Sequence, residues 1–165
     1  MRRENELRQW MQHVNVSEDH YTILQDARIQ DGFNQLWDLT LCSQILHETI
    51  QEKGIREVYS FDAKGVSKHP NHIATFHTLE RLSQDPSMGH VSFFSLNSGS
   101  PLTKYTGPLS LIKKRVNCIY NSNPLLSLNT FRIHRSQITW YRVLFTVLSR
   151  YSYENCWNPL VAPSP

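Results

Sequence analysis

Residues 56–82 read REVYSFDAKGVSKHPNHIATFHTLERL, and this stretch predicts one complete strand–loop–helix unit. Segment 56–61 combines β-branched and aromatic residues, as a buried strand does. Segment 70–82 carries apolar residues at helical spacing, and Pro70 stands at its first position, where a missing N–H costs nothing. Gly65 lies in the loop between them. A strand that feeds a helix in this way is the building block of an α/β sheet.

The same alternation runs through the rest of the chain. The other predicted elements are helices over 2–14 and 35–53, one or two helices over 124–151, and strands over 21–24, 91–96 and 114–120. Gly54 is well placed to end the second of these helices. The pattern indicates an α/β fold built from crossover units. Doubly wound domains open on a strand, however, whereas this chain opens inside a helix.

Length and composition are those of a folded domain. The chain has 165 residues, of which 39% are apolar and 19% charged, with a formal charge of +3. Its basic residues are dispersed apart from the run 113–115, and no nucleic-acid motif is present, so we expect no nucleic-acid partner. An anionic headgroup or a membrane surface is equally compatible with this charge.

Neither the cysteines nor the apolar segments indicate a secreted or membrane-spanning chain. Cys42, Cys118 and Cys156 are far apart and form no CxxC pair, so we expect neither a zinc knuckle nor a disulfide framework, and a reducing compartment. The N-terminus lacks the apolar region of a signal peptide. The longest apolar stretch, 140–148, is interrupted by Arg142 and is too short to cross a bilayer.

Two histidines stand where sites form in open α/β sheets, beyond the carboxyl end of a strand and at a helix N-terminus. His72 lies at the end of the apolar face of segment 70–82, and His69 lies three residues earlier. A neutral imidazole there is a good zinc ligand, and Asp62 could orient it or hold a polar substrate group. The alternative is that His69 and His72 are ordinary polar residues that cap the helix. Catalytic zinc also needs about three protein ligands, and this stretch supplies one or two.

Three motifs in order along the chain resemble the PIG-L (LmbE-like) de-N-acetylase family. The first is SFDAKGVSKHPNHIA at 60–74, which is similar to a family pattern TFDxxGxSxHxNHIA. The second is HRSQ at 134–137, followed by an aromatic-rich helix. The third and weakest is RENELRQ at 3–9. Asp26 and Asp31 fall where the family has an acidic loop. The resemblance is strongest to the eukaryotic members, which act on N-acetylglucosaminyl-phosphatidylinositol in GPI-anchor biosynthesis.

The resemblance implies a three-layer Rossmann-like (LmbE-like) sheet with helices on both faces, and zinc-dependent hydrolysis of an amide that releases acetate. It implies that His72 ligates zinc and that His69 is catalytic, polarising the amide carbonyl or protonating the leaving amine. Arg3 corresponds to a substrate-binding arginine. His134 and Gln137 correspond to positions near the substrate, although His134 is equally compatible with a satisfied polar residue among helices. Asp62 completes the expected substrate-binding set.

The chain also departs from the family. It contains no Ala-His-Pro-Asp-Asp-Glu-like motif, which would supply two further zinc ligands and the general base, and no N-terminal anchor. We therefore expect an N-terminally truncated deacetylase domain over 1–153, a flexible tail over 154–165, and an incomplete zinc site. Such a chain would be inactive alone. The alternative is a non-catalytic isoform or fragment that binds phosphatidylinositol-linked sugar or a partner protein.

The implied substrate is a glycolipid, so a membrane surface is an expected partner. By family, the location is the cytoplasmic face of the endoplasmic reticulum membrane, or the cytosol where no anchor is present. Segment 138–153 carries aromatic and apolar residues at helical spacing together with Arg142 and Arg150. A helix of this kind can lie in the membrane interface. The alternative is that its apolar face packs as ordinary core.

Overall fold

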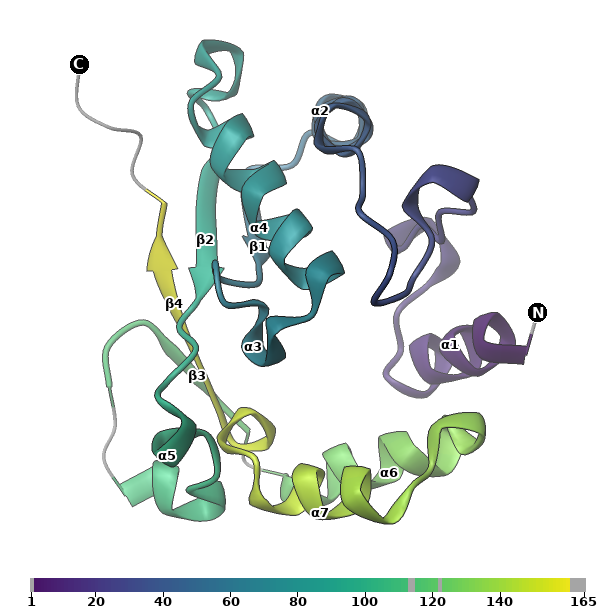
Figure 1. Cartoon of the computed structure of the whole chain (residues 1–165), viewed down its shortest axis with the longest axis vertical. Coiled ribbons are helices and arrows are strands. Elements are labelled where there is room, and N and C mark those ends of the chain that lie inside the picture. Colours follow the sequence, from purple (N-terminus) through teal and green to yellow (C-terminus); the bar gives the residue numbers. More distant parts are fainter. Residues whose placement is uncertain (1, 113–114, 122, 161–165) are drawn as a thin grey trace. The chain divides into compact units, whose positions relative to one another are not determined.

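A computed structural model describes residues 2–112, 115–121 and 123–160 (Figure 1). The chain divides into two compact units. Unit 1 comprises residues 1–24 and 99–155, and unit 2 comprises residues 25–98 and 156–165. Helices and strands are mixed along the chain, so the α/β class is confirmed.

Unit 2 contains the strand–loop–helix stretch, and the structure confirms its elements. They are α2 (Leu39–Lys53), β1 (Glu57–Ser60), α3 (Gly65–Lys68), α4 (Pro70–Ser83) and β2 (Ser92–Leu96), with short 3₁₀ turns at Ala27–Ile29 and Pro86–Met88. Asp38 caps α2 by accepting N–H groups from Thr40 and Leu41, which explains why the helix begins later than predicted. Gly54 ends it in the left-handed conformation, at φ 61°, as predicted.

The strands join in the order β1-β2-β4-β3, where β3 is Cys118–Tyr120 and β4 is Glu154–Pro159. β1 and β2 are parallel, with Val58 opposite Phe93, and β2 pairs antiparallel with the end of β4, with Phe94 opposite Pro159. Residues 154–159 therefore form a strand, although sequence patterning assigned them to a tail. The predicted strand at 21–24 is wrong, since these residues have no regular structure.

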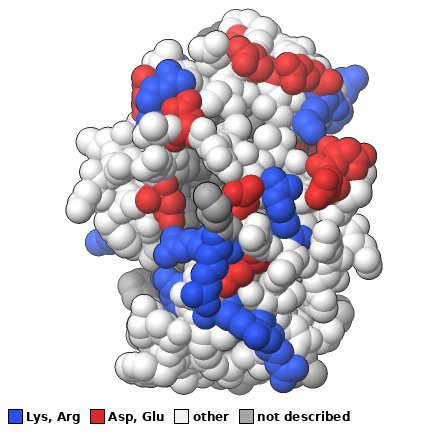
Figure 2. Space-filling model, turned by 90° about the vertical axis from the view of Figure 1, so that its right-hand side faces the viewer, with Lys and Arg blue, Asp and Glu red and all other residues white. Residues whose placement is uncertain are grey.

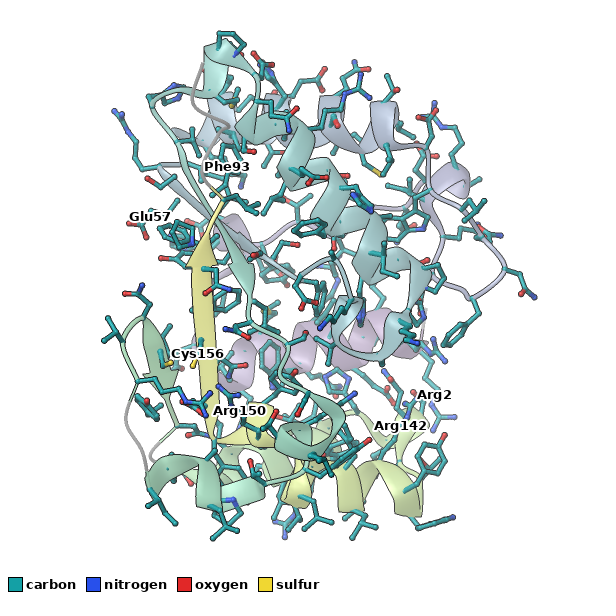
Figure 3. All side chains as sticks on the ribbon, turned by 60° about the vertical axis from the view of Figure 1, so that its left-hand side comes forward. Arg2, Glu57, Phe93, Arg142, Arg150 and Cys156 are labelled. Carbon is teal, nitrogen blue, oxygen red and sulfur yellow. The ribbon has the colours of Figure 1, made fainter. Side chains whose placement is uncertain are left out.

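The core of unit 2 lies between the helices and one face of the sheet. Ile50 of α2, Leu79 and Leu82 of α4, Phe93 of β2 and the intervening Met88 are buried together. Figure 3 labels Phe93 on β2 and Glu57 on the neighbouring β1. The opposite face carries three aromatic rings: Tyr59 stacks on Phe94 at 4.7 Å between centroids and meets Trp157 edge-on at 5.1 Å. Packing of Leu79 and Leu82 in the core holds α4 on the sheet, and α4 carries the histidine pair.

Unit 1 is mainly helical. Its helices are α1 (Arg2–His13), α5 (Pro101–Lys104), α6 (Pro124–Ile133) and α7 (Trp140–Leu148), with 3₁₀ segments at Glu18–His20, η4 (Gly107–Ile112), η5 (Arg135–Gln137) and η6 (Arg150–Ser152). Trp10 donates its indole N–H to the Thr130 hydroxyl at 3.1 Å, which joins α1 to α6. Arg150 and Glu154 form a buried ion pair at 2.7 Å; Figure 3 labels Arg150.

Two expectations are corrected here. Thr146 is the one residue of α7 that is buried, while Trp140 is 79% exposed and Leu144 is 50% exposed, so this helix does not pack as core. Cys118 and Cys156 are disulfide-bonded, whereas their spacing indicated no disulfide framework, because residues far apart in sequence can meet in the fold. Among the described residues, no helix is both long enough and apolar enough to span a bilayer.

Candidate functional site

The candidate site of unit 2 lies at the carboxyl ends of the parallel strands β1 and β2, as predicted for open α/β sheets. Asp62 follows β1 and Ser98 follows β2. The Asp62 carboxylate accepts the backbone N–H of Lys64 at 3.1 Å and that of Ser98 at 3.2 Å. Asp62 thus joins the two strand ends, and these two hydrogen bonds go to backbone amides rather than to a histidine.

The loop between β1 and α4 has an unusual backbone. Gly65 has a φ of +55°, and Val66 and Lys68 each have a φ of 62°. A positive φ is rare for a β-branched residue and costs on the order of 1–3 kcal/mol. Gly65 also lies against α4, since a Cβ there would be 3.0 Å from the Cβ of His72 and 3.0 Å from Ile73 Cγ1. The tight loop places the Gly65 carbonyl beside the His72 ring.

His69 caps α4. Its Nδ1 accepts the backbone N–H of Asn71 at 3.3 Å, so in the neutral ring the proton is on Nε2. That Nε2 lies 3.9 Å from an oxygen of Asp31, and the ring is packed against Phe33 at 4.3 Å between centroids. His69 therefore caps the helix through Nδ1, as the alternative proposed, while its Nε2–H remains a hydrogen-bond donor.

His72 has the opposite arrangement. Its Nδ1 lies 3.1 Å from the Gly65 carbonyl oxygen, which can only accept, so Nδ1 carries the proton and Nε2 keeps its lone pair. The ring stacks on Phe61 at 3.9 Å between centroids and lies 4.9 Å from the His69 ring. Burial lowers the pKa of His72, although the bond to Gly65 partly opposes this. A neutral imidazole held through Nδ1–H is the usual form of a metal-ligating histidine.

Asn71 is a site residue that sequence reasoning did not single out, although it lies inside the HPNH motif. It is buried, and its amide group donates to an Asp31 oxygen at 3.0 Å. Its Oδ1 is buried without a hydrogen-bond partner, as is the Ser98 hydroxyl. A buried oxygen without a partner calls for an explanation, and a bound polar group such as water or an ion supplies one.

The acidic loop contributes one residue to this site. Asp31 contacts both His69 and Asn71. Asp26 instead pairs with the neighbouring Arg28, which lowers the pKa of Asp26 to about 2. The proximity of Asp31 to the HPNH motif, across 40 positions, has no local signal in the sequence.

The residues that the structure describes do not complete a zinc site at His72. Among the described residues, no three potential metal ligands that include His72 lie within 4.8 Å of one another. The disulfide removes the thiols of Cys118 and Cys156 from the available ligands. His72 Nε2 is suited to zinc, but a single nitrogen cannot hold the ion in a defined geometry.

His134, Gln137 and Arg3 belong to unit 1. His134 and Gln137 line a cavity of about 230 Å³ together with Thr130, Phe131 and Arg142. The Nδ1 of His134 is buried without a hydrogen-bond partner, so His134 is not a fully satisfied polar residue. The Gln137 side chain accepts from Arg142 at 3.0 Å. Arg3 is exposed on α1.

Two of the quoted motifs meet inside unit 1. Glu6, from the α1 motif, is buried and accepts the backbone N–H of Ser136, from the HRSQ motif, at 2.9 Å. Its other oxygen accepts the Ser136 hydroxyl, and this bond lowers the pKa of Glu6. The pairing explains in structural terms why a glutamate on the first helix accompanies the HRSQ segment.

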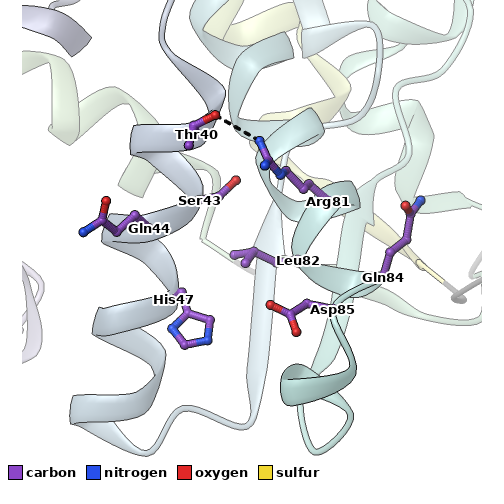
Figure 4. A pocket seen from close by; sticks show the side chains of 8 residues that line it. All are labelled: Thr40, Ser43, Gln44, His47, Arg81, Leu82, Gln84 and Asp85. Atoms are coloured by element: carbon purple, nitrogen blue, oxygen red, sulfur yellow. Dashed lines mark hydrogen bonds between the residues drawn. The ribbon is translucent and has the colours of Figure 1, made fainter.

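A pocket of unit 2 holds none of the predicted site residues. It has a volume of about 340 Å³ and lies between α2 and α4, lined by Thr40, Ser43, Gln44, His47, Arg81, Leu82, Gln84 and Asp85 (Figure 4). Arg81 donates to Thr40 across it at 3.2 Å, and His47 contacts Ser87 at 3.3 Å. Gln44, His47 and Asp85 bond Glu48 or Ser87 outside the pocket, and the Ser43 hydroxyl is buried without a hydrogen-bond partner. The histidine pair remains the stronger candidate because it lies at the carboxyl ends of parallel strands and this pocket does not.

Comparison with known proteins agrees with the motifs. No family model and no solved structure matches the chain. Three curated relatives do match along nearly all of it. They are a probable N-acetylglucosaminyl-phosphatidylinositol de-N-acetylase of Schizosaccharomyces pombe, 28% identical over 93% of this chain, one of Dictyostelium discoideum, 26% identical over 93%, and the N-acetylglucosaminyl-phosphatidylinositol de-N-acetylase of Bos taurus, 27% identical over 94%.

The chain spans 66%, 73% and 64% of the lengths of these three relatives, respectively. The resemblance predicted from the motifs is confirmed by these matches. Proteins with these names hydrolyse an amide bond, so the relatives are hydrolases.

Proposed function

We propose that this chain, a relative of the N-acetylglucosaminyl-phosphatidylinositol de-N-acetylases, forms the carbonyl-facing part of a site that hydrolyses the N-acetyl group of such a glycolipid. The products would be acetate and a free glucosamine amine. The proposed setting is GPI-anchor biosynthesis at the cytoplasmic face of the endoplasmic reticulum membrane. Support comes from the names of three relatives and from the geometry of one pair of side chains.

The observation that carries the proposal is the complementary protonation of His69 and His72. The Nε2–H of His69 can donate to the acetyl carbonyl and to the negative charge that develops on its oxygen during attack. The Nε2 lone pair of His72 remains free because its Nδ1 proton is held by Gly65. Asp31, close to His69, can hold this ring in orientation and would stabilise its charged form when it takes up a proton.

Zinc belongs to the proposal as the group that the resemblance implies. When bound, it would supply an acidified water and a positive charge near the carbonyl. His72 would be one of its ligands, and the described residues do not complete the set. We therefore expect the 165-residue chain to be inactive alone.

The second candidate is a non-catalytic chain that binds phosphatidylinositol-linked sugar. The cavity at His134, with an unpaired ring nitrogen beside Arg142, favours it because this cavity could receive a polar group without any metal.

One binding experiment separates the two candidates. Purified chain is titrated with short-chain N-acetylglucosaminyl-phosphatidylinositol and, in parallel, with the same glycolipid lacking the acetyl group. A deacetylase site should prefer the acetylated ligand, and His69→Ala should remove the preference, because His69 donates to the acetyl oxygen. Equal binding of both ligands would favour the sugar-binding candidate, and no binding of either would overturn both.

Activity is measured on the same samples as acetate release. We expect none above a His72→Ala control. Release above that control would contradict the inference that the site is incomplete.

A further inference from the structure

Charge is divided unevenly between the two units. Unit 1 has eleven Lys and Arg against five Asp and Glu, a formal charge of +6, whereas unit 2 has a formal charge of −3. Residues 86–153 contain eight Lys and Arg and no acidic residue. Figure 2 shows basic side chains gathered into a band, with acidic side chains beside it, on the face that it draws. Glu154, which ends the acid-free stretch, is buried and paired with Arg150.

Exposed apolar side chains concentrate in the same stretch. Of the twenty large hydrophobic residues that are exposed among those described, sixteen lie between Leu102 and Leu148. They include Leu102 at 88%, Ile112 at 80% and Trp140 at 79% exposure. Soluble proteins rarely leave such a concentration uncovered unless it contacts a partner or a membrane.

Three of the elements that carry these residues are in contact. Tyr105, at the end of α5, meets Phe145 of α7 edge-on at 6.0 Å, and the Lys104 amine lies 5.4 Å from the centre of the Phe145 ring. Gly107, the first residue of η4, approaches the Val147 carbonyl so closely that a Cβ would lie 3.3 Å from it. We call this connected surface the α5–η4–α7 face.

We propose that the α5–η4–α7 face docks on the surface of an anionic phospholipid membrane. Trp and Tyr at the start of α7, apolar residues along it and Lys and Arg in a stretch of sequence that holds no Asp or Glu are the combination that favours the membrane interface. Because the helix is short and no described helix can span a bilayer, the contact is peripheral. The charge of unit 1 complements anionic headgroups. This inference goes beyond the proposed function and rests on it only for the choice of phosphatidylinositol as the test lipid.

The test is sedimentation of the 165-residue chain with vesicles of phosphatidylcholine containing one-fifth phosphatidylinositol, with vesicles of pure phosphatidylcholine as reference. We expect at least tenfold tighter binding to the anionic vesicles, weakened by 0.5 M salt. Trp140→Ser/Leu144→Ser should lower binding at least tenfold. Lys104→Gln should weaken binding to anionic vesicles while leaving that to neutral vesicles unchanged.

A matched control is Leu36→Ser, which removes an apolar side chain that is 90% exposed in unit 2. It should bind vesicles like the unmodified chain. Circular dichroism should show that every variant is folded, as expected for substitutions at exposed positions. Since the chain has three other tryptophans, the lipid-induced blue shift of its fluorescence is assigned by its loss in Trp140→Phe.

Sedimentation velocity without lipid tests whether a second copy of the chain, rather than a membrane, occupies the α5–η4–α7 face. A dimer that Trp140→Ser/Leu144→Ser dissociates, in a chain that ignores vesicles, would overturn the proposal and make this face an interface between copies. Vesicle binding that persists unchanged in the double variant would overturn it as well. A monomer whose vesicle binding depends on Trp140 and Leu144 would support it.

Discussion

At the scale of single residues, His69 and His72 differ in which ring nitrogen carries the proton. The backbone N–H of Asn71 donates to His69 Nδ1, and the backbone carbonyl of Gly65 accepts from His72 Nδ1. We therefore expect ¹⁵N NMR to show His69 as the Nε2–H tautomer and His72 as the Nδ1–H tautomer at neutral pH. Assignment uses the variants His69→Gln and His72→Gln. The same tautomer in both rings would contradict the roles proposed for them.

The lowered pKa of His72 has a consequence for acid stability. Burial disfavours its charged form, so below the ordinary histidine pKa of 6.5 the unfolded chain takes up this proton more readily than the folded chain. The contribution of His72 to the free energy of unfolding is fully present above pH 6.5, and it is lost as pH falls from 6.5 through the lowered pKa of the folded state. His72→Gln should flatten the decline of the thermal midpoint over that window, and an identical decline in both proteins would contradict this.

At the scale of elements, the loop before α4 holds the histidine pair by its close contact with the helix. Gly65→Ala should destabilise the chain by about 2–4 kcal/mol, because it combines a positive φ with a 3.0 Å approach to His72. Gly54→Ala is the matched control: it has a similar φ, +61°, but its Cβ would meet nothing within 4 Å. It should cost only about 1 kcal/mol. If urea unfolding showed equal losses of unfolding free energy in Gly65→Ala and Gly54→Ala, the close contact of Gly65 with α4 would contribute nothing to stability.

The link between α1 and the HRSQ segment is the corresponding feature of unit 1. The Ser136 hydroxyl lowers the pKa of Glu6, so this bond contributes stability above the ordinary glutamate pKa of 4.5 and loses it as pH falls below that value. Ser136→Ala should lower the thermal midpoint at pH 7, and by less at low pH. Glu6→Gln and Ser136→Ala each disturb the same bond between the Ser136 hydroxyl and the Glu6 carboxylate. The double variant should therefore lose less unfolding free energy than the sum of the two single losses. Additive losses would show that the two residues act independently.

At the scale of the whole molecule, the described residues do not bring a complete ligand set to His72. Chain purified with added zinc and then dialysed should therefore contain well below one zinc per chain. Chelator should leave its thermal midpoint unchanged, since no folding energy comes from the metal. One tightly held zinc per chain, lost in His72→Ala, would contradict this inference.

Local patterns in the sequence were sufficient for most of unit 2. The strand at 57–60, the helix that begins at Pro70 and the glycine that ends α2 all depend on residues a few positions apart. Such signals are carried by side-chain periodicity, a fixed proline φ and the freedom of glycine, none of which requires distant contacts. For the same reason the position of His69 and His72, beyond a strand end and at a helix start, could be predicted.

Local patterns could not predict contacts between residues far apart in the sequence. Those contacts decided strand β4, the surroundings of the histidine pair and the exposure of α7. Strand β4 pairs with β2 through residues 157–159, some sixty positions later in the chain, and Asp31 reaches the histidine motif across 40 positions. The protonation of each ring depends on which backbone group the folded loop presents to it. The apolar stripe of α7 was compatible with a buried and with an interfacial helix, and it favoured the buried one. Its exposure could be settled only once every neighbouring element had its place, because burial is a property of the packed chain rather than of one helix.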